Sequence, residues 1–203
     1  MYSKLNSKEI FNIIYSRLDG HSIAREGRRK LNYFYSGHTY GEITYEGFSK
    51  MLKFCKPKDH EIFYDLGSGT GKAVILASLL ANFSVLIGIE IINELHKASH
   101  EILNHYNRIT EKIYFRHPKQ FIDFINNDFA NVDFSDADII FMNATCFEYE
   151  LNFPMIKKLD KLKKGARIIT NTRFIKTPTY NVENIGTFPF SWGSEYAFLH
   201  TKK

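Results

Sequence analysis

A glycine-rich stretch, Asp65–Gly71, contains the residues whose types and spacing most clearly indicate chemistry. It has the sequence Asp-Leu-Gly-Ser-Gly-Thr-Gly and lies between the run 61–64, typical of a buried strand, and the run 72–77, typical of the start of a helix. Glycines at alternate positions let the backbone turn tightly and approach a ligand closely. The stretch therefore predicts a site for a nucleotide-like cofactor, with an ordinary tight turn as the alternative.

The residues next to the glycines distinguish three classes of cofactor loop. A triphosphate-binding loop needs Lys and then Ser or Thr after its last glycine, but here Ala73 follows Lys72, and Leu66 stands where that loop has its first glycine. A dinucleotide-binding loop needs a small residue at the position of Lys72. Both classes are thereby excluded. Alternate glycines after an Asp resemble instead the first motif of class I S-adenosylmethionine-dependent methyltransferases, which faces the amino acid part of the cofactor.

Two further segments carry acidic residues at positions that suit the same cofactor. Glu90 ends an apolar run, 25 positions after Asp65, and a carboxylate about 20 residues after such a loop accepts hydrogen bonds from ribose hydroxyls. Asp128 and Phe129 follow a third apolar run and are suited to contact the adenine amino group and ring. The alternatives are a solvated glutamate at a strand end and an acidic turn beside a core phenylalanine.

The composition predicts one soluble enzyme domain. Of 203 residues, 44% are hydrophobic and 24% are charged, which excludes a disordered chain. No apolar run reaches the roughly 18 residues of a membrane span, and the N-terminus lacks the apolar segment of a signal peptide. Cys55 and Cys146 are too few for a disulfide framework or a zinc site, so we expect an intracellular location, cytoplasmic or nuclear, and no metal. The net charge of +5 permits an anionic partner.

Alternating strand and helix patterns predict an α/β fold, with a parallel sheet covered by helices on both faces. Apolar spacing predicts an N-terminal helix that ends near Asp19, a second helix capped by Ser22, and a third at about 46–54. The predicted core consists of strands at 61–66, 84–90, 121–125, 137–142 and 165–171 and helices at 71–81, 93–106 and 153–162. An antiparallel hairpin of 180–185 and 196–201 is expected at the sheet edge. The expected organisation is a helical segment with a cofactor lid at 1–56 and a cofactor-binding core at 57–203.

A motif upstream of the first predicted strand indicates which family of methyltransferases the chain resembles. Thr39–Tyr45, with the sequence Thr-Tyr-Gly-Glu-Ile-Thr-Tyr, precedes the helix that leads into the core. Together with the glycine loop, Phe141-Met142-Asn143 and the tail Trp192…Leu199-His200-Thr201, it resembles the DOT-one family over about 37–201. These are histone-lysine methyltransferases of class I, without a SET domain. The resemblance implies a Rossmann-like, mostly parallel seven-stranded sheet that ends in an antiparallel hairpin.

The resemblance also implies a role for each matching residue. It implies S-adenosylmethionine as the cofactor, S-adenosylhomocysteine as the product, and a lysine of a histone or another basic protein as the methyl acceptor. The implied cofactor-binding residues are Tyr40 and Glu42 in the lid, Asp65, Gly67, Gly69 and Gly71 at the methionine portion, Glu90 at the ribose, and Asp128 and Phe129 at the adenine. Lys72, directly after the glycine loop, is predicted to bind the cofactor as well. The implied acceptor-site residues, which position the lysine without acting as nucleophiles, are Asn143, Trp192, Tyr196 and Phe198.

Some positions depart from the family pattern. Lys72 stands where the family commonly has Gln, and an alignment on Leu199-His200-Thr201 puts Ala197 where the family has a channel tyrosine. Neighbouring residues of a strand face opposite sides of the sheet, so Tyr196 can replace that tyrosine only if the strand contains a bulge. The departures thus concern lysine specificity more than cofactor binding.

Other acceptors and a role without catalysis stay open at the level of sequence. Methyl transfer from a sulfonium is an in-line displacement, so alignment and exclusion of water supply most of the rate. The alternatives are a class I methyltransferase that acts on RNA, another protein or a small molecule, and a cofactor-binding interaction module. Two basic clusters, 25–30 and 157–164, could contact nucleic acid weakly, although a solvated face is expected for the second. The oligomeric state is left open.

Overall fold

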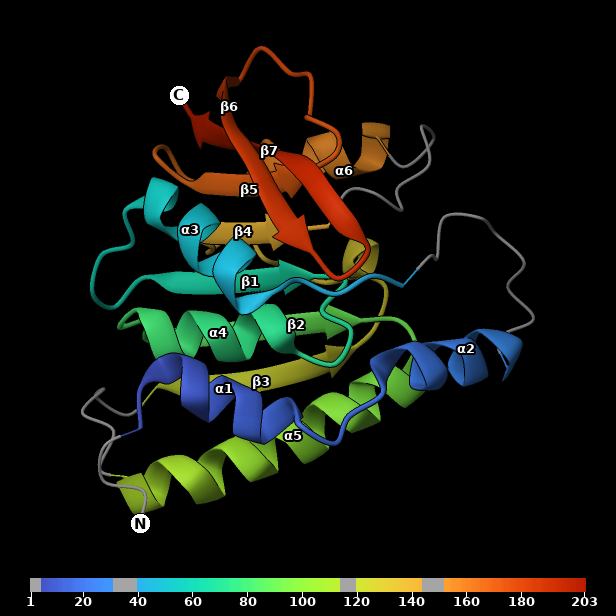
Figure 1. The fold of residues 1–203 in the computed structure, drawn as a ribbon. Helices are drawn as coiled ribbons and strands as arrows, with labels where there is room; N and C mark the ends of the chain where they lie inside the picture. Colours follow the sequence, from blue (N-terminus) through green and yellow to red (C-terminus); the bar gives the residue numbers. More distant parts are fainter. Residues whose placement is uncertain (1–4, 31–39, 114–119, 144–151) are drawn as a thin grey trace.

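The computed structural model describes residues 5–30, 40–113, 120–143 and 152–203, and a seven-stranded sheet forms its centre (Figure 1). The strands are β1 (Ile62–Leu66), β2 (Val85–Glu90), β3 (Phe121–Asn126), β4 (Ile139–Met142), β5 (Arg167–Asn171), β6 (Tyr180–Phe190) and β7 (Gly193–Lys202). Their order in the sheet is β3-β2-β1-β4-β5-β7-β6. The first five strands are parallel, and β7 pairs antiparallel with β5 and β6. The predicted α/β class is therefore confirmed, including the hairpin at the sheet edge.

Helices cover both faces of this sheet. They are α1 (Ser7–Tyr15), α2 (Gly20–Lys30), α3 (Tyr45–Cys55), α4 (Lys72–Leu80), α5 (Asn93–Ile113) and α6 (Asn152–Leu159). One buried cluster joins α1, α3, α4 and α5 to the sheet face that carries Phe63 and Phe141, here called the α4 face. A second cluster joins α6 to the face that carries Leu66 and Met142, here called the α6 face. Residues alternate between these faces along each strand.

The N-terminal helices begin at side-chain caps. The Asn6 side chain accepts hydrogen bonds at the start of α1 and Glu9 bonds back to the Asn6 backbone, which completes a capping box. The predicted Ser22 cap is wrong, because α2 begins at Gly20 and Asp19 accepts hydrogen bonds from Ser22 N–H (3.1 Å) and Oγ (2.6 Å). The helix α2 lies beside the start of α5, at the edge where β1 and β2 end (Figure 1).

The hairpin is longer and its turn tighter than the sequence predicts. β6 and β7 are joined by Ser191 and Trp192 alone. Their pairing is irregular between Asn184 and Gly186 of β6, whereas β7 pairs with β5 in continuous register. The pairing with β5 thus contains no bulge in β7. The helix α5 also extends to Ile113, beyond its predicted end. Among the described helices, none has the length and apolarity needed to cross a membrane.

Candidate functional site

The glycine loop leaves β1 at the edge where the parallel strands end. Gly67, Gly69 and Gly71 have φ values of 83°, 55° and 83°, a left-handed conformation that strains residues with a Cβ atom. Gly71 is the N-cap of α4, and its N–H donates to Ser68 O (2.8 Å). A Cβ atom on Gly67 would meet no atom within 4 Å, so the loop is open to a ligand at this residue.

Glu90 holds the loop from the end of β2. Its Oε2 accepts a hydrogen bond from Gly69 N–H and its Oε1 one from Ile92 N–H, both at 2.8 Å. Burial raises the pKa of Glu90, although these backbone donors favour its ionised form. The Ile91 backbone also favours the ionised form, so three of the roughly four acceptor positions of this carboxylate face backbone donors and one is left for a ligand hydroxyl.

Asp65 is a buried carboxyl group for which the described residues supply no ion-pair partner. It pairs in register with Phe141, and Phe141 with Ile169, so its side chain lies on the α4 face. Burial and the nearby Glu90 raise the pKa of Asp65 well above its usual range, and no hydrogen bond from the described residues reaches its carboxyl group. In the same part of the chain, Ser68 Oγ is buried without a hydrogen-bond partner. These groups favour a ligand that brings a positive charge and hydrogen-bonding atoms.

The lid motif lies against the loop and is bonded to it. The Tyr40 hydroxyl donates to Glu42 Oε1 (2.6 Å) and lies 3.3 Å from Thr70 Oγ1, and the Tyr40 ring packs against Gly69. Burial, with Glu42 as the next cause, raises the pKa of Tyr40, so its hydroxyl is a donor at neutral pH. Glu42 Oε2 forms an ion pair with Lys72 at 2.6 Å. The predicted residues Tyr40, Glu42 and Lys72 thus come together.

Tyr15 of α1 contacts the same loop, and sequence reasoning missed it. Its hydroxyl donates to Thr70 O (3.3 Å), and Lys72 Nζ lies 5.2 Å from the centre of its ring. Burial raises the pKa of Tyr15. Tyr15 has the helical spacing of a core residue, so no pattern in the sequence marks it as part of a site.

Asp128 and Phe129 lie at a short 3-10 turn, η2 (Phe129–Asn131), which follows β3 at the same edge of the sheet. Asp128 Oδ1 accepts a hydrogen bond from Ala130 N–H (2.8 Å) and caps this turn. Lys158 of α6 donates from Nζ to Phe129 O (3.0 Å) and Val132 O (2.6 Å). The ammonium group of Lys158 therefore fixes the backbone that carries both predicted residues.

Two of the predicted acceptor-site residues lie at the edge of the sheet that carries the glycine loop. Asn143 directly follows β4, the strand next to β1. Trp192 lies in the turn between β6 and β7, and its Nε1–H donates to Glu195 Oε1 (3.1 Å). The Trp192 ring packs against Gly41 of the lid so closely that a Cβ atom on Gly41 would overlap it. Trp192 therefore joins the lid to the hairpin.

Tyr196 and Phe198, the other two acceptor-site predictions, lie on the α6 face. Phe198 pairs with Thr170 and Thr170 with Met142, which belongs to the cluster on that face. Tyr196, two residues before Phe198, is 59% exposed. Phe198 packs against Phe174, with 5.4 Å between ring centres. The structure thus separates these aromatic residues from Asp65, whose side chain lies on the opposite face.

Ala197 lies on the α4 face and is the pairing partner, on the neighbouring strand, of a residue that sequence reasoning missed. Asn171 pairs with Ala197 in register and is fully buried at the end of β5. Its side chain follows that of Ile169 by two positions and so shares the α4 face. A signal was available in the sequence, because Asn171 ends an apolar strand just as Asn143 follows β4.

Comparison with known proteins assigns the chain to a family. The family described as histone methylation protein DOT1 matches residues 21–188. The chain belongs to the DOT1 family. Among its relatives are H3 lysine-79 specific histone-lysine N-methyltransferases of Candida glabrata, 27% identical over 157 residues, and Eremothecium gossypii, 32% identical over 146 residues. These matches cover 74% and 67% of this chain but only 24% of each relative, so the chain spans about a quarter of their length. The resemblance inferred from the motifs is confirmed.

Solved structures show the same fold at low sequence identity. A precorrin-6y C5,15-methyltransferase from Geobacter metallireducens has a TM-score of 0.56 and 18% identity, and the match covers 77% of this chain and 86% of that one. A putative RNA methyltransferase from Pyrococcus horikoshii has a TM-score of 0.55 and 16% identity, with 98% of both chains covered. The class I, Rossmann-like architecture predicted for a DOT1-family chain is thereby confirmed.

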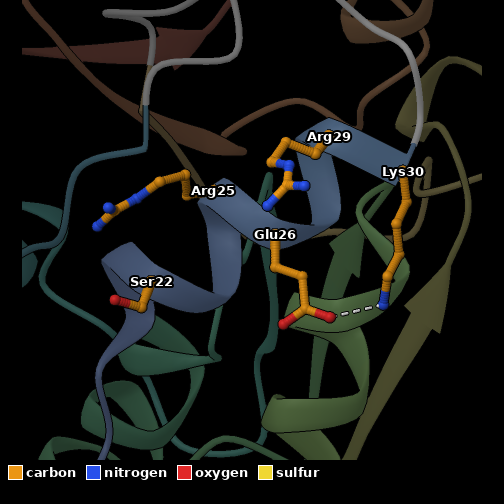
Figure 2. A pocket seen from close by; sticks show the side chains of 5 residues that line it. All are labelled: Ser22, Arg25, Glu26, Arg29 and Lys30. Carbon is orange, nitrogen blue, oxygen red and sulfur yellow. Dashed lines mark ion pairs between the residues drawn. The ribbon is translucent and has the colours of Figure 1, made fainter.

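The basic clusters of this DOT1-family chain are partly neutralised. On α2, Lys30 forms ion pairs with Glu26 (2.8 Å) and Glu94 (3.0 Å). The Arg25 side chain extends away from the Lys30–Glu26 pair (Figure 2). Ser22, Arg25, Glu26, Arg29 and Lys30 line an open hollow on this one helix. In the second cluster, Lys163 pairs with Asp138 (2.6 Å), and Lys158 is bonded as described above. Nucleic-acid contact through these clusters stays a prediction.

The histidine pair of α5 is not accompanied by further metal ligands in the described ranges. His96 and His100 contact each other edge to face, with 4.6 Å between ring centres. Across the described residues, no group of three or more His, Cys, Asp or Glu side chains could hold a metal ion.

Proposed function

We propose that this chain is an S-adenosylmethionine-dependent methyltransferase whose acceptor is a lysine of a histone or another basic protein. The observation that carries the cofactor assignment is the buried Asp65 carboxyl group, which has no cation beside it within the described part of the chain and lies next to the open backbone at Gly67. The cofactor carries an ammonium group and a sulfonium, so it supplies the charge that this site favours. The Glu90 carboxylate has an acceptor position left for a ribose hydroxyl.

The cofactor supplies an electrophilic methyl group, and the residues of the chain bind, orient and exclude water. In this proposal Asp65 and the glycine loop hold the methionine portion, Glu90 the ribose, and Asp128 and Phe129 the adenine. Tyr40 and Glu42 close the loop from the lid side. Their bonds to Thr70 and Lys72 reduce access of water to the reacting atoms, which strengthens the electrostatic interactions there.

Asn143 and Trp192 position the acceptor in the proposal, since both lie at the edge that carries the loop. An attacking lysine must be neutral, and a desolvated channel favours loss of its proton. Roles for Tyr196 and Phe198 at the acceptor would need their side chains to act from the α6 face. The names of the relatives support a histone acceptor and an intracellular place of action, in the nucleus or the cytoplasm.

Transfer of a tritiated methyl group tests the proposal. Core histones, reconstituted nucleosomes, ribosomal proteins and total RNA are offered in parallel, and labelled products are located by mass spectrometry. The expected result is label on the ε-amino group of lysine in a protein acceptor, absent with Asn143→Ala. Label in RNA alone would support the alternative acceptor class, and cofactor binding without transfer to any acceptor would support an interaction module.

Replacement of Lys158 by Met should weaken the binding of adenosine-containing ligands. The substitution removes two hydrogen bonds from an ammonium group, each worth about 1.5–3 kcal/mol, and frees the turn at Asp128 and Phe129. We expect about a tenfold loss of affinity for both S-adenosylhomocysteine and free adenosine, measured by calorimetry. Lys161→Met, on the same basic run, is the matched control. Unchanged adenosine affinity in Lys158→Met would contradict an adenine site at this turn.

A further inference from the structure

Lys72 carries a positive charge at an unfavourable place for its helix. It is the first residue of α4, and a helix N-terminus already has a partial positive charge. Its side chain is only 19% exposed, and its nearest ionic partner is Glu42, whose side chain is 12% exposed. The ion pair and the nearby Tyr15 ring compensate the charge of Lys72. The pair is therefore more protected from solvent than an ordinary surface ion pair.

Glu42 is bonded in two directions. Its side chain contacts Lys72 and Tyr40 on the side of the glycine loop. Its backbone N–H donates to Ser191 Oγ (3.1 Å), and its backbone C=O accepts from Ser191 N–H (2.9 Å), in the turn between β6 and β7. One lid residue thus joins the loop to the hairpin turn.

The residues on both sides of Glu42 continue this contact. Ile43 forms an antiparallel β-bridge with Phe190, at the end of β6. Gly41 provides the surface on which the Trp192 ring packs, and no larger residue would fit there. A displacement of the lid backbone would therefore displace or uncover Trp192.

We infer that Lys72 is a positioning residue for the acceptor side of the site: through Glu42 it holds the lid, and through the lid it fixes Trp192. The inference rests on the proposed function, which assigns the loop to the cofactor and the turn to the acceptor. Without Lys72, the Glu42 carboxylate would keep Tyr40 as its only side-chain partner among the described residues and would gain by turning towards solvent. Ligand binding at the loop is accordingly coupled to the environment of Trp192.

Trp192 is the only tryptophan of the chain, so its fluorescence reports this coupling directly. The first comparison uses ligand-free wild type, Lys72→Met, Lys72→Arg and Glu42→Gln. Lys72→Met and Glu42→Gln should shift the emission of Trp192 to longer wavelength and increase its quenching by iodide. Lys72→Arg keeps the cation and should retain the wild-type emission. Lys53→Met removes an exposed lysine of α3 and serves as the matched control.

The second comparison adds saturating S-adenosylhomocysteine. We expect the ligand to protect Trp192 from iodide in wild type and Lys53→Met, and this protection to be lost in Lys72→Met. Unchanged Trp192 emission and quenching in a folded Lys72→Met protein would overturn the inference, as would a Lys72→Arg protein that behaves like Lys72→Met. If Lys72→Met does not fold, the isosteric Glu42→Gln decides by the same readout. Failure of wild type to bind S-adenosylhomocysteine would refute the proposed function instead, and the ligand-free comparison would still test the contact.

Discussion

Replacement of Asp65 by Asn should reduce S-adenosylmethionine affinity by at least about 100-fold, about 2.7 kcal/mol. No hydrogen-bond donor from the described residues reaches this buried carboxyl group, and Asn has nearly the same shape without the charge. The variant therefore removes the attraction for a cationic ligand and leaves the loop geometry intact. Calorimetric titration of the two proteins measures the difference.

The same substitution should make the protein more stable in the absence of ligand. Burial and then Glu90 raise the pKa of Asp65, so the folded state binds this proton more tightly than the unfolded state. The stabilisation that this carboxyl group contributes is fully present below its pKa in the unfolded state, near 3.9. It is lost as the pH rises through the raised pKa of the folded state. At neutral pH, Asp65 thus lowers the free energy of unfolding. We expect Asp65→Asn to raise Tm by about 2–4 °C, the effect of about 1 kcal/mol in a chain of this size.

The opposite signs of these two effects separate a binding residue from a structural one. Asp59→Asn, which changes an exposed aspartate outside the site, is the matched control and should alter neither affinity nor Tm. An Asp65→Asn protein that lost stability and kept its affinity would show that the carboxylate serves the fold and not a ligand.

Replacement of Arg167 by Ala should destabilise the fold by about 3–5 kcal/mol, the cost of leaving a buried charge unpaired. Arg167, at the start of β5, forms an ion pair with Glu61 before β1, and both side chains are less than 15% exposed, at 12% and 13%. Its Nη1 also donates to Cys55 O (2.7 Å) at the end of α3. The change therefore frees three elements that this side chain joins. Chemical denaturation followed by circular dichroism measures the loss.

An exposed ion pair is the control for Arg167. Lys8 pairs with Glu46, and both side chains are about half exposed, at 53% and 48%. Lys8→Ala should change the denaturation midpoint far less than Arg167→Ala, because solvent screens an exposed pair. Equal effects of the two substitutions would contradict the role assigned to burial.

The sequence predicted the parts of the site that depend on local pattern. The glycine loop follows the apolar strand β1 and Glu90 ends the apolar strand β2, and parallel strands that end at one edge bring such residues together. The same reasoning would have found Asn171 at the end of β5. The contacts of Tyr15 with Thr70 and of Lys72 with Glu42 could not be predicted, because they depend on how segments distant in sequence pack.

The face of the sheet on which Tyr196 lies also could not be predicted from the local sequence pattern. A shift of one residue in register moves every side chain of a strand to the other face. The register of β7 follows from a turn of Ser191 and Trp192 and from the irregularity at Gly186 in the partner strand. Neither feature has a signal strong enough to fix the register before the sheet is assembled.

A calorimetric titration of the wild-type chain with S-adenosylmethionine, in parallel with Asp65→Asn, tests most directly whether the Asp65 carboxylate holds this cofactor. We expect binding at one site per chain in wild type and its near loss in Asp65→Asn, while both proteins stay folded. A folded wild-type chain that does not bind S-adenosylmethionine, or a folded Asp65→Asn chain that binds it equally well, would contradict the proposed cofactor site.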